Sequence, residues 1–101
     1  MKLDKPDNYN DLPDENKRKI AGLIAIGNEL SLKGFDVNQI GVNLKDESDT
    51  GIVTVLLGSL PVYEIDINTG LIFEINNYEK GMQFGVKEDG DTFVLVPLLL
   101  N

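Results

Sequence analysis

Cysteine and histidine are both missing from this 101-residue chain. The absence of cysteine excludes disulfides, thiolate metal sites and cysteine nucleophiles. The absence of histidine removes the commonest metal ligand and the commonest general acid or base near neutral pH, and with it every Ser-His-Asp or Cys-His arrangement. An enzyme built from this sequence would have to use carboxylates, lysine, tyrosine, serine or threonine alone. We therefore expect a protein that is not an enzyme and that binds no metal or cofactor.

Long apolar runs are also missing, since no stretch approaches the roughly 20 residues that span a bilayer. The first 17 residues have no apolar centre, which argues against a signal peptide. The hydrophobic fraction of 42% nevertheless indicates a folded chain with one core. We expect a cytoplasmic protein without membrane contacts. It is predicted to form a single domain over residues 12–101, preceded by a loose, flexible arm over residues 1–11.

Positive charge is scarce, because nine lysines and arginines oppose 17 aspartates and glutamates, for a net charge of -8. The imbalance lies in residues 34–101, which hold eleven acids and three bases. Such a field repels nucleic acid and anionic membranes and attracts basic proteins. An acidic surface can equally serve solubility alone. The placement of the acids must therefore decide between the two interpretations.

The segment from Pro13 to Lys33 is predicted to be a helix. Proline suits the first helical turn, acidic residues follow it, and Gly34 supplies a stop at the other end. Gly22 and Gly27 are expected to let the helix lie close against a sheet. A single apolar stripe is formed by Ile20, Leu23, Ile24, Gly27 and Leu30, which recur at spacings of three and four.

Apolar segments separated by turn signals predict strands in the rest of the chain. The predicted strands are residues 39–45, 52–57, 62–67, 71–75, 82–87 and 92–99. Their connections are short, so neighbouring strands should pair antiparallel, and Asp89-Gly90 is a strong hairpin signal. The predicted fold class is α+β, with one N-terminal helix packed on a five- or six-stranded antiparallel β-meander.

The stretch VYEIDINTGLIFEIN, residues 62–76, is typical of two strands joined by a tight turn. A three-residue loop, Asn68-Thr69-Gly70, would place Glu64 directly opposite Glu74. Like charges in that position destabilise a sheet by up to about 1 kcal/mol. Their placement therefore suggests a surface that meets a positive partner. A two-residue loop would slip the register by one residue and dissolve the pair.

A partner-binding surface is predicted on this face of the sheet and on the turns beside it. Its predicted residues are Glu64, Asp66, Ile72 and Glu74, the turn acids Asp46, Glu47 and Asp49, and Tyr78 and Glu79 of the following loop. An ordinary solvated face, neutralised by nearby lysines, is the alternative. The helix can cover only one face of the sheet, yet residues 53–57 and 94–98 are apolar on both faces. The arm, a tight curl of the sheet or another chain would have to cover the second face.

In size, acidity, composition and predicted topology, the whole chain resembles the small acidic immunity proteins of bacterial contact-dependent and polymorphic toxin systems. The resemblance implies a non-catalytic inhibitor that binds a basic protein toxin, typically a nuclease, and occludes its cationic active site. Electrostatic attraction would speed capture, and apolar contacts would set affinity. Two alternatives remain. One is a homodimeric structural or interaction module, and the other is a phage-encoded inhibitor that mimics the charge of nucleic acid.

Overall fold

The structure is a computed structural model that describes residues 3–43, 50–75 and 83–98. Within these residues the chain forms one α-helix, two short 3-10 helices and six strands. In chain order the elements are η1 (Tyr9–Asp11), α1 (Asp14–Leu32), η2 (Val37–Gln39), β1 (Ile40–Asn43), β2 (Ile52–Leu57), β3 (Leu60–Asp66), β4 (Ile72–Glu74), β5 (Gln83–Asp89) and β6 (Thr92–Leu98).

The six strands form one antiparallel sheet in which neighbours in sequence are neighbours in space, in the order β1 to β6. This arrangement follows from the short connections, which leave no room for a crossover. Asp89 pairs with Thr92 across a tight turn in which Gly90 has a φ of 62°, so the predicted hairpin is confirmed there. The predicted α+β class, with an N-terminal helix on an antiparallel sheet, is confirmed.

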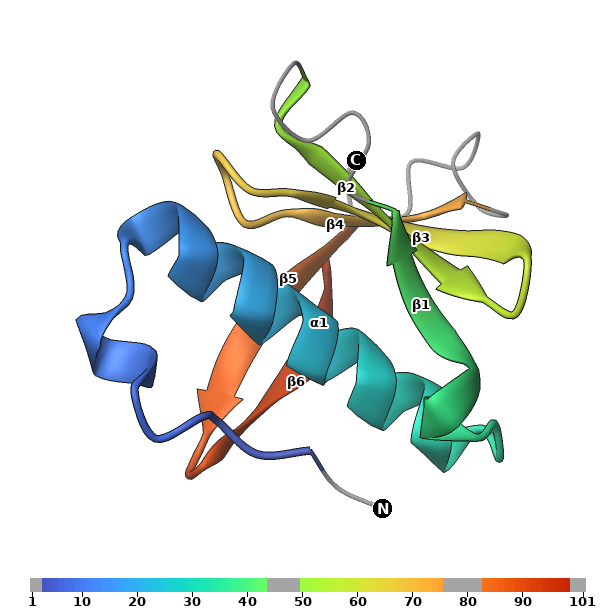
Figure 1. Cartoon of the computed structure of the whole chain (residues 1–101), viewed down its shortest axis with the longest axis horizontal. Helices are drawn as coiled ribbons and strands as arrows, with labels where there is room; N and C mark the ends of the chain where they lie inside the picture. Colours follow the sequence, from blue (N-terminus) through green and yellow to red (C-terminus); the bar gives the residue numbers. More distant parts are fainter. Residues whose placement is uncertain (1–2, 44–49, 76–82, 99–101) are drawn as a thin grey trace.

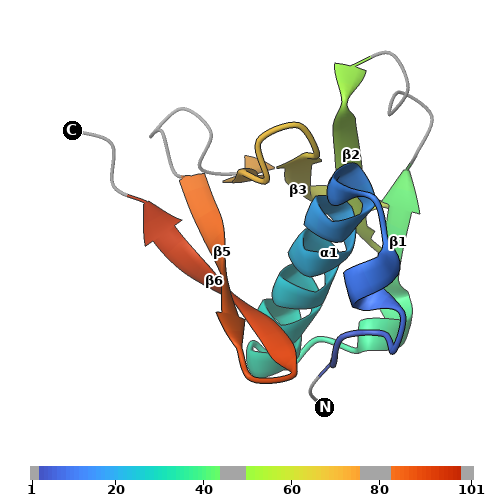
Figure 2. The same ribbon diagram turned by 90° about the vertical axis from the view of Figure 1, so that its left-hand side faces the viewer.

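The sheet is strongly curled, and α1 lies along its concave face (Figure 1). Strands β1 to β3 lie on one side of the helix, and β5 and β6 lie on the other (Figure 2). The helix contacts β6 and β3 most extensively. A sheet of this shape encloses the helix far more completely than a flat sheet would.

The middle of α1 is consequently buried on nearly every side. Ile24 and Leu30, which belong to the predicted stripe, lie in the core, but Ala25 and Ile26 are also fully buried. Ile26 packs with β2, β3 and β4, whereas Ala25 packs with Phe93 of β6. The apolar stripe predicted from the sequence therefore covers only part of the surface that α1 buries.

Gly22 lies where α1 comes closest to β3. A Cβ atom built at Gly22 would lie 3.0 Å from Cδ1 of Ile65, a side chain that is itself fully buried. Glycine thus allows the helix axis to approach the strand more closely than a larger residue would. The prediction that Gly22 brings the helix against the sheet is confirmed.

The N-terminal segment is packed against the domain, in contrast to the loose arm predicted for residues 1–11. The side chain of Leu3 lies over Gly27 of α1, and the backbone N–H of Lys5 donates to the carbonyl oxygen of Asp91 over 2.7 Å. These contacts use one leucine and backbone groups, so no apolar run in the sequence announces them. The folded domain therefore includes Leu3 and the residues that follow it, and it does not begin at residue 12 as predicted.

Asn28 joins this segment to the far end of the chain. Its side-chain Oδ1 accepts the N–H of Leu3 over 2.7 Å, while its Nδ2 donates to Thr92 Oγ1 over 2.8 Å and to the Phe93 carbonyl over 3.1 Å. The hydroxyl of Thr92 in turn donates to the Leu3 carbonyl. Because Asn28 and Thr92 are buried, these bonds satisfy groups that water does not reach.

Candidate functional site

The turn between β3 and β4 contains four residues, Ile67 to Gly70, rather than the three that were predicted. The N–H of Asp66 donates to the Leu71 carbonyl over 2.9 Å, and the N–H of Gly70 donates back to the Asp66 carbonyl over 2.7 Å. Ile67 belongs to this turn, yet its side chain is buried in the core. Gly70 has a φ of 80°, which suits glycine in either type of loop.

The extra residue moves the register by one position, so the predicted Glu64–Glu74 pair does not form. Glu64 pairs with Phe73, and Glu74 pairs with Tyr63. Residues paired across antiparallel strands share one face of the sheet, and successive residues alternate between faces. Glu64 therefore lies on the open, convex face, whereas Glu74 lies on the face that carries the helix. The prediction of facing carboxylates was wrong.

Ile72 was also predicted to meet a partner, and this prediction was wrong too. Ile72 pairs with Ile65 of β3 and with Phe84 of β5, and its side chain is fully buried in the core. It stabilises the fold and cannot contact another protein. Five other predicted site residues lie outside the described part of the chain: Asp46, Glu47, Asp49, Tyr78 and Glu79.

Two of the predicted carboxylates do share the open face of the sheet. Glu64 lies opposite Thr54 of β2, and Asp66 lies opposite Ile52. Both acids are half-buried, and one oxygen of Asp66 accepts the backbone N–H of Asn68 over 2.9 Å. The open face thus carries two carboxylates among apolar and neutral neighbours, which is a weaker negative patch than the sequence predicted.

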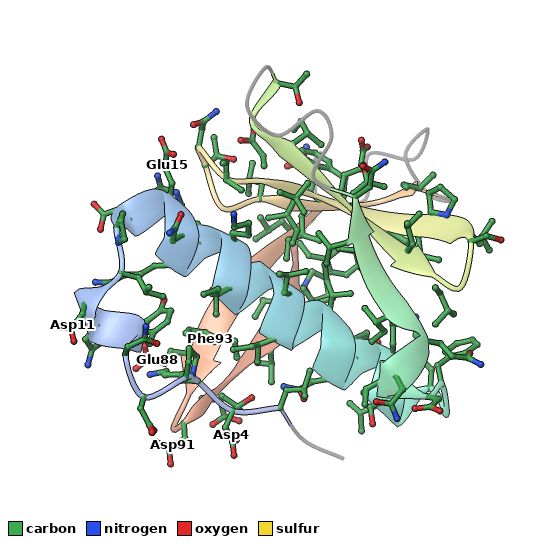
Figure 3. All side chains as sticks on the ribbon, viewed as in Figure 1. Asp4, Asp11, Glu15, Glu88, Asp91 and Phe93 are labelled. Carbon is green, nitrogen blue, oxygen red and sulfur yellow. The ribbon has the colours of Figure 1, made fainter. Side chains whose placement is uncertain are left out.

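Sequence reasoning missed a denser group of acids, which we call the acidic corner. It consists of Asp4, Asp7, Glu88 and Asp91, and three of these are labelled in Figure 3. Asp4, Asp7 and Asp91 line one shallow hollow at the side of the molecule where the N-terminal segment meets the β5–β6 turn. The acids around Gly90 are visible in the sequence, but only the folded chain brings the N-terminal acids to them.

Lys5 is the cation within the acidic corner. Its Nζ lies 3.1 Å from Oε1 of Glu88, and it also lies 5.2 Å from the ring centroid of Phe93 and 5.6 Å from that of Tyr9. The two rings pack on each other with their centroids 5.3 Å apart. Lys5 is thereby held among fixed partners, and the remaining carboxylates of the corner face solvent.

Other cations in the described part of the chain are engaged in a similar way. Lys17 lies over the Tyr9 ring, Arg18 donates to the Ile67 carbonyl, and Lys33 pairs with Glu29. Among the described residues, carboxylates outnumber cations by 13 to 6. The cations therefore cannot neutralise the surface, and the protein presents a net negative field to its surroundings.

A second feature, which we call the end groove, lies at the C-terminal end of α1. Its volume is about 270 Å³, and its lining residues are Leu30, Lys33, Phe35, Leu57, Leu60, Val62, Tyr63 and Glu74. The floor is apolar and buried, whereas Phe35 and Leu60 on its walls are 45% and 59% exposed. Exposed large apolar side chains around a hollow are typical of a binding site rather than of ordinary surface.

Glu74, Tyr63 and Lys33 are the polar residues of the end groove. Burial, followed by the charges of Glu74 and Glu29, raises the pKa of Tyr63 to about 12. Glu29 is paired with Lys33, whose Nζ lies 3.8 Å from its carboxylate. In the described part of the chain, no cation pairs with Glu74. The end groove thus combines an apolar floor with a negative edge.

Neither a metal site nor a membrane-spanning helix is present among the described residues. No three His, Cys, Asp or Glu side chains among residues 3–43, 50–75 and 83–98 converge in a way that could hold a metal ion. In the same residues, no helix has the length and apolar content needed to cross a membrane. The groups present at the two surfaces are carboxylates, two tyrosines, two lysines, one asparagine and apolar side chains.

No protein-family model, no curated protein and no solved structure matches this chain. The fold and the surfaces of this chain are therefore the basis on which its function is inferred.

Proposed function

We propose that this protein is a non-catalytic acidic inhibitor of the immunity-protein kind, which binds a basic protein toxin in the cytoplasm and covers the toxin's cationic active site. A nuclease is the toxin class that fits best, because a site that binds a polyanion must itself be positively charged. Binding of nucleic acid or of an anionic membrane by this chain is disfavoured by the same charge rule.

The observation that supports the proposal most directly is the surplus of carboxylates whose neighbouring cations are already engaged. The acidic corner shows this clearly, because Asp4, Asp7 and Asp91 share a hollow with Lys5, and Lys5 is paired with Glu88. The predicted Glu64–Glu74 pair gives no support, since these two acids lie on opposite faces of the sheet. The support therefore comes from the folded arrangement of the N-terminal segment and the β5–β6 turn.

In this proposal the acids act mainly on the rate of encounter. Complementary charge raises association rates and orients the partner, whereas dissociation depends on the contacts made after docking. The field acts over a Debye length of about 8 Å at physiological ionic strength. Association should therefore be fast at low salt and slow steeply as salt is added.

The test uses the basic protein encoded beside the gene for this chain. That protein is expressed in bacteria with and without the chain, and growth is measured. Protection from growth arrest is the expected result. A neighbour that is neither basic nor toxic, or a toxin that this chain fails to neutralise and to bind in vitro, would rule the proposal out.

The charge mechanism is tested on the same pair of proteins by stopped-flow measurements. The triple variant Asp4→Asn, Asp7→Asn and Asp91→Asn should slow association by about three- to tenfold at low salt and leave dissociation unchanged. At high salt the variant and the parent should converge, because screening removes the contribution of all three charges. Equal association rates at low salt would show that the acidic corner does not steer the partner.

A further inference from the structure

The walls of the end groove are held in place by backbone hydrogen bonds. On one side, α1 ends at Leu32, Gly34 just beyond it has a φ of 92°, and the N–H of Phe35 donates back to the Leu30 carbonyl over 3.0 Å. On the other side, the β2–β3 turn is fixed by the N–H of Gly58, which donates to the Gln39 carbonyl over 2.8 Å. The exposed side chains of Phe35 and Leu60 therefore project from ordered backbone, and the hollow between them is formed before any partner arrives.

The floor of the end groove is continuous with the protein core. Leu30, Val62 and Tyr63 lie at its base with exposed fractions of 4%, 9% and 3%. A volume of about 270 Å³ lies at the lower limit for small-molecule pockets and suits one large side chain better than a whole cofactor. An inserted apolar side chain would be surrounded by apolar atoms on several sides, which is the environment in which interface hot spots occur.

We infer that the end groove is the docking point for a segment of the basic partner in which one large apolar side chain is flanked by an arginine or lysine. The apolar side chain would fill the space between Phe35 and Leu60, and the flanking cation would pair with Glu74. This inference rests on the proposed function, because it names where the basic partner is held. In this inference, contacts in the end groove slow the dissociation of the partner, whereas the acidic corner affects only the rate of association.

Charge complementarity selects this occupant over a second copy of the chain. In an isologous dimer the same surface of both copies would meet, and Lys33, the lysine that lines this groove, is already paired with Glu29. Each copy also carries a net charge of -8, and like charges brought together across an interface are unfavourable. A cationic partner instead supplies the charge that Glu74 lacks among the described residues.

The first experiment uses a defined probe, the peptide acetyl-Phe-Arg-amide, and follows backbone amide shifts of the whole chain by NMR. The expected result is saturable, weak binding that moves the amides of residues 30–35, 60, 62, 63 and 74. The matched peptide acetyl-Phe-Glu-amide should produce clearly smaller shifts, because its acid would lie beside Glu74. Shifts of equal size with both peptides, or shifts confined to other surfaces, would overturn the inference.

Matched variants separate the groove from general effects of charge and apolarity. Glu74→Gln should weaken acetyl-Phe-Arg-amide by about two- to fivefold, the range expected for one exposed ion pair. Glu64→Gln removes the same charge from the other face of the same hairpin and should have no effect. Leu60→Ser should weaken the peptide by about fivefold or more, whereas Leu32→Ser, at a side chain that is 85% exposed outside the groove, should not.

The same variants distinguish this inference from the proposed function. If the chain neutralises the basic toxin but Leu60→Ser and Glu74→Gln dissociate from it no faster than the parent, the groove inference fails and the function stands. If the peptide binds as expected but no basic partner is neutralised, the function fails and the groove stands. Sedimentation supplies the remaining outcome, since a dimer that Leu60→Ser dissociates would show that the occupant is a second copy and overturn the inference.

Discussion

Nδ2 of Asn28, in the C-terminal half of α1, donates a hydrogen bond over 2.8 Å to Oγ1 of Thr92, the first residue of β6, 64 positions later in the chain. The same Asn28 side chain accepts the N–H of Leu3. One buried amide thus ties together the N-terminal segment, the helix and the last hairpin. The N-terminal segment and the last hairpin lie at opposite ends of the sequence, so the connection exists only in the folded state.

Replacing this amide should be costly. Asn28→Leu keeps a similar volume but leaves the N–H of Leu3 without its acceptor, and it removes the donor to the Thr92 hydroxyl oxygen and the Phe93 carbonyl. Unsatisfied buried groups cost about 1–3 kcal/mol each. We expect the free energy of unfolding in urea to fall by about 2–3 kcal/mol. Asn38→Ala, at an exposed position in η2, is the control and should change it little. Equal effects of the two substitutions would contradict the assigned role of Asn28.

Removal of residues 1–5 tests whether the N-terminal segment belongs to the domain. The truncation loses the contact of Leu3 with Gly27 and the bond from Lys5 to Asp91. We expect the free energy of unfolding to fall by about 2 kcal/mol, from the lost apolar burial and hydrogen bonds. Asp4→Asn, within the same segment but exposed, should leave it nearly unchanged. An unaltered urea midpoint in the truncated chain would restore the loose arm that the sequence predicted.

Gly22 should not tolerate a branched side chain. Gly22→Val would force its new atoms against Ile65, whose Cδ1 lies only 3.0 Å from the position of the added Cβ. Overpacking of this kind lowers the free energy of unfolding by about 1–3 kcal/mol. Gly41→Val is the control, because no heavy atom lies within 4 Å of a Cβ built at Gly41 in β1. A destabilisation of similar size in both variants would show that the contact with Ile65 is unimportant.

The raised pKa of Tyr63 should make the protein less stable at alkaline pH. Its pKa is raised from the ordinary 10.0 to about 12, mainly by burial and then by Glu74 and Glu29. Between these two values the unfolded chain releases the phenolic proton and the folded chain retains it, so the free energy of unfolding falls as pH rises. Tyr63→Phe should remove this part of the decline. Urea unfolding at about pH 9 and about pH 11 provides the measurement.

The titration of Tyr63 also tests whether Glu74 lies beside it. Tyrosinate absorbance, taken as the difference between the parent and Tyr63→Phe, isolates the titration of Tyr63. In Glu74→Gln the pKa of Tyr63 should fall towards its ordinary value, because one neighbouring negative charge is gone. Glu64→Gln should leave the titration curve unmoved, since Glu64 lies on the other face of the sheet. A shift in Glu64→Gln alone would contradict the observed register.

The amino-acid sequence by itself determined the α-helix, the strands and their order, but not the two short 3-10 helices. Helical spacing from Pro13 to Lys33, period-two alternation in the strands and the turn signal at Asp89-Gly90 were sufficient, because each depends on residues close together in the chain. The short connections then left an antiparallel meander as the natural topology. The absence of cysteine and histidine likewise limited the chemistry without reference to the fold.

Tertiary structure decided the register of the β3–β4 hairpin and the position of the N-terminal segment. Gly70 is compatible with a loop of three residues or of four, and the four-residue loop of the structure buries Ile72 in the core opposite Ile65. Successive strand residues point to opposite faces of the sheet, so the one-residue difference in loop length placed Glu64 and Glu74 on opposite faces. The acidic corner and the end groove are likewise built from segments distant in sequence. Local preferences cannot place such segments together, because packing and buried hydrogen bonds across the whole chain determine which of them meet.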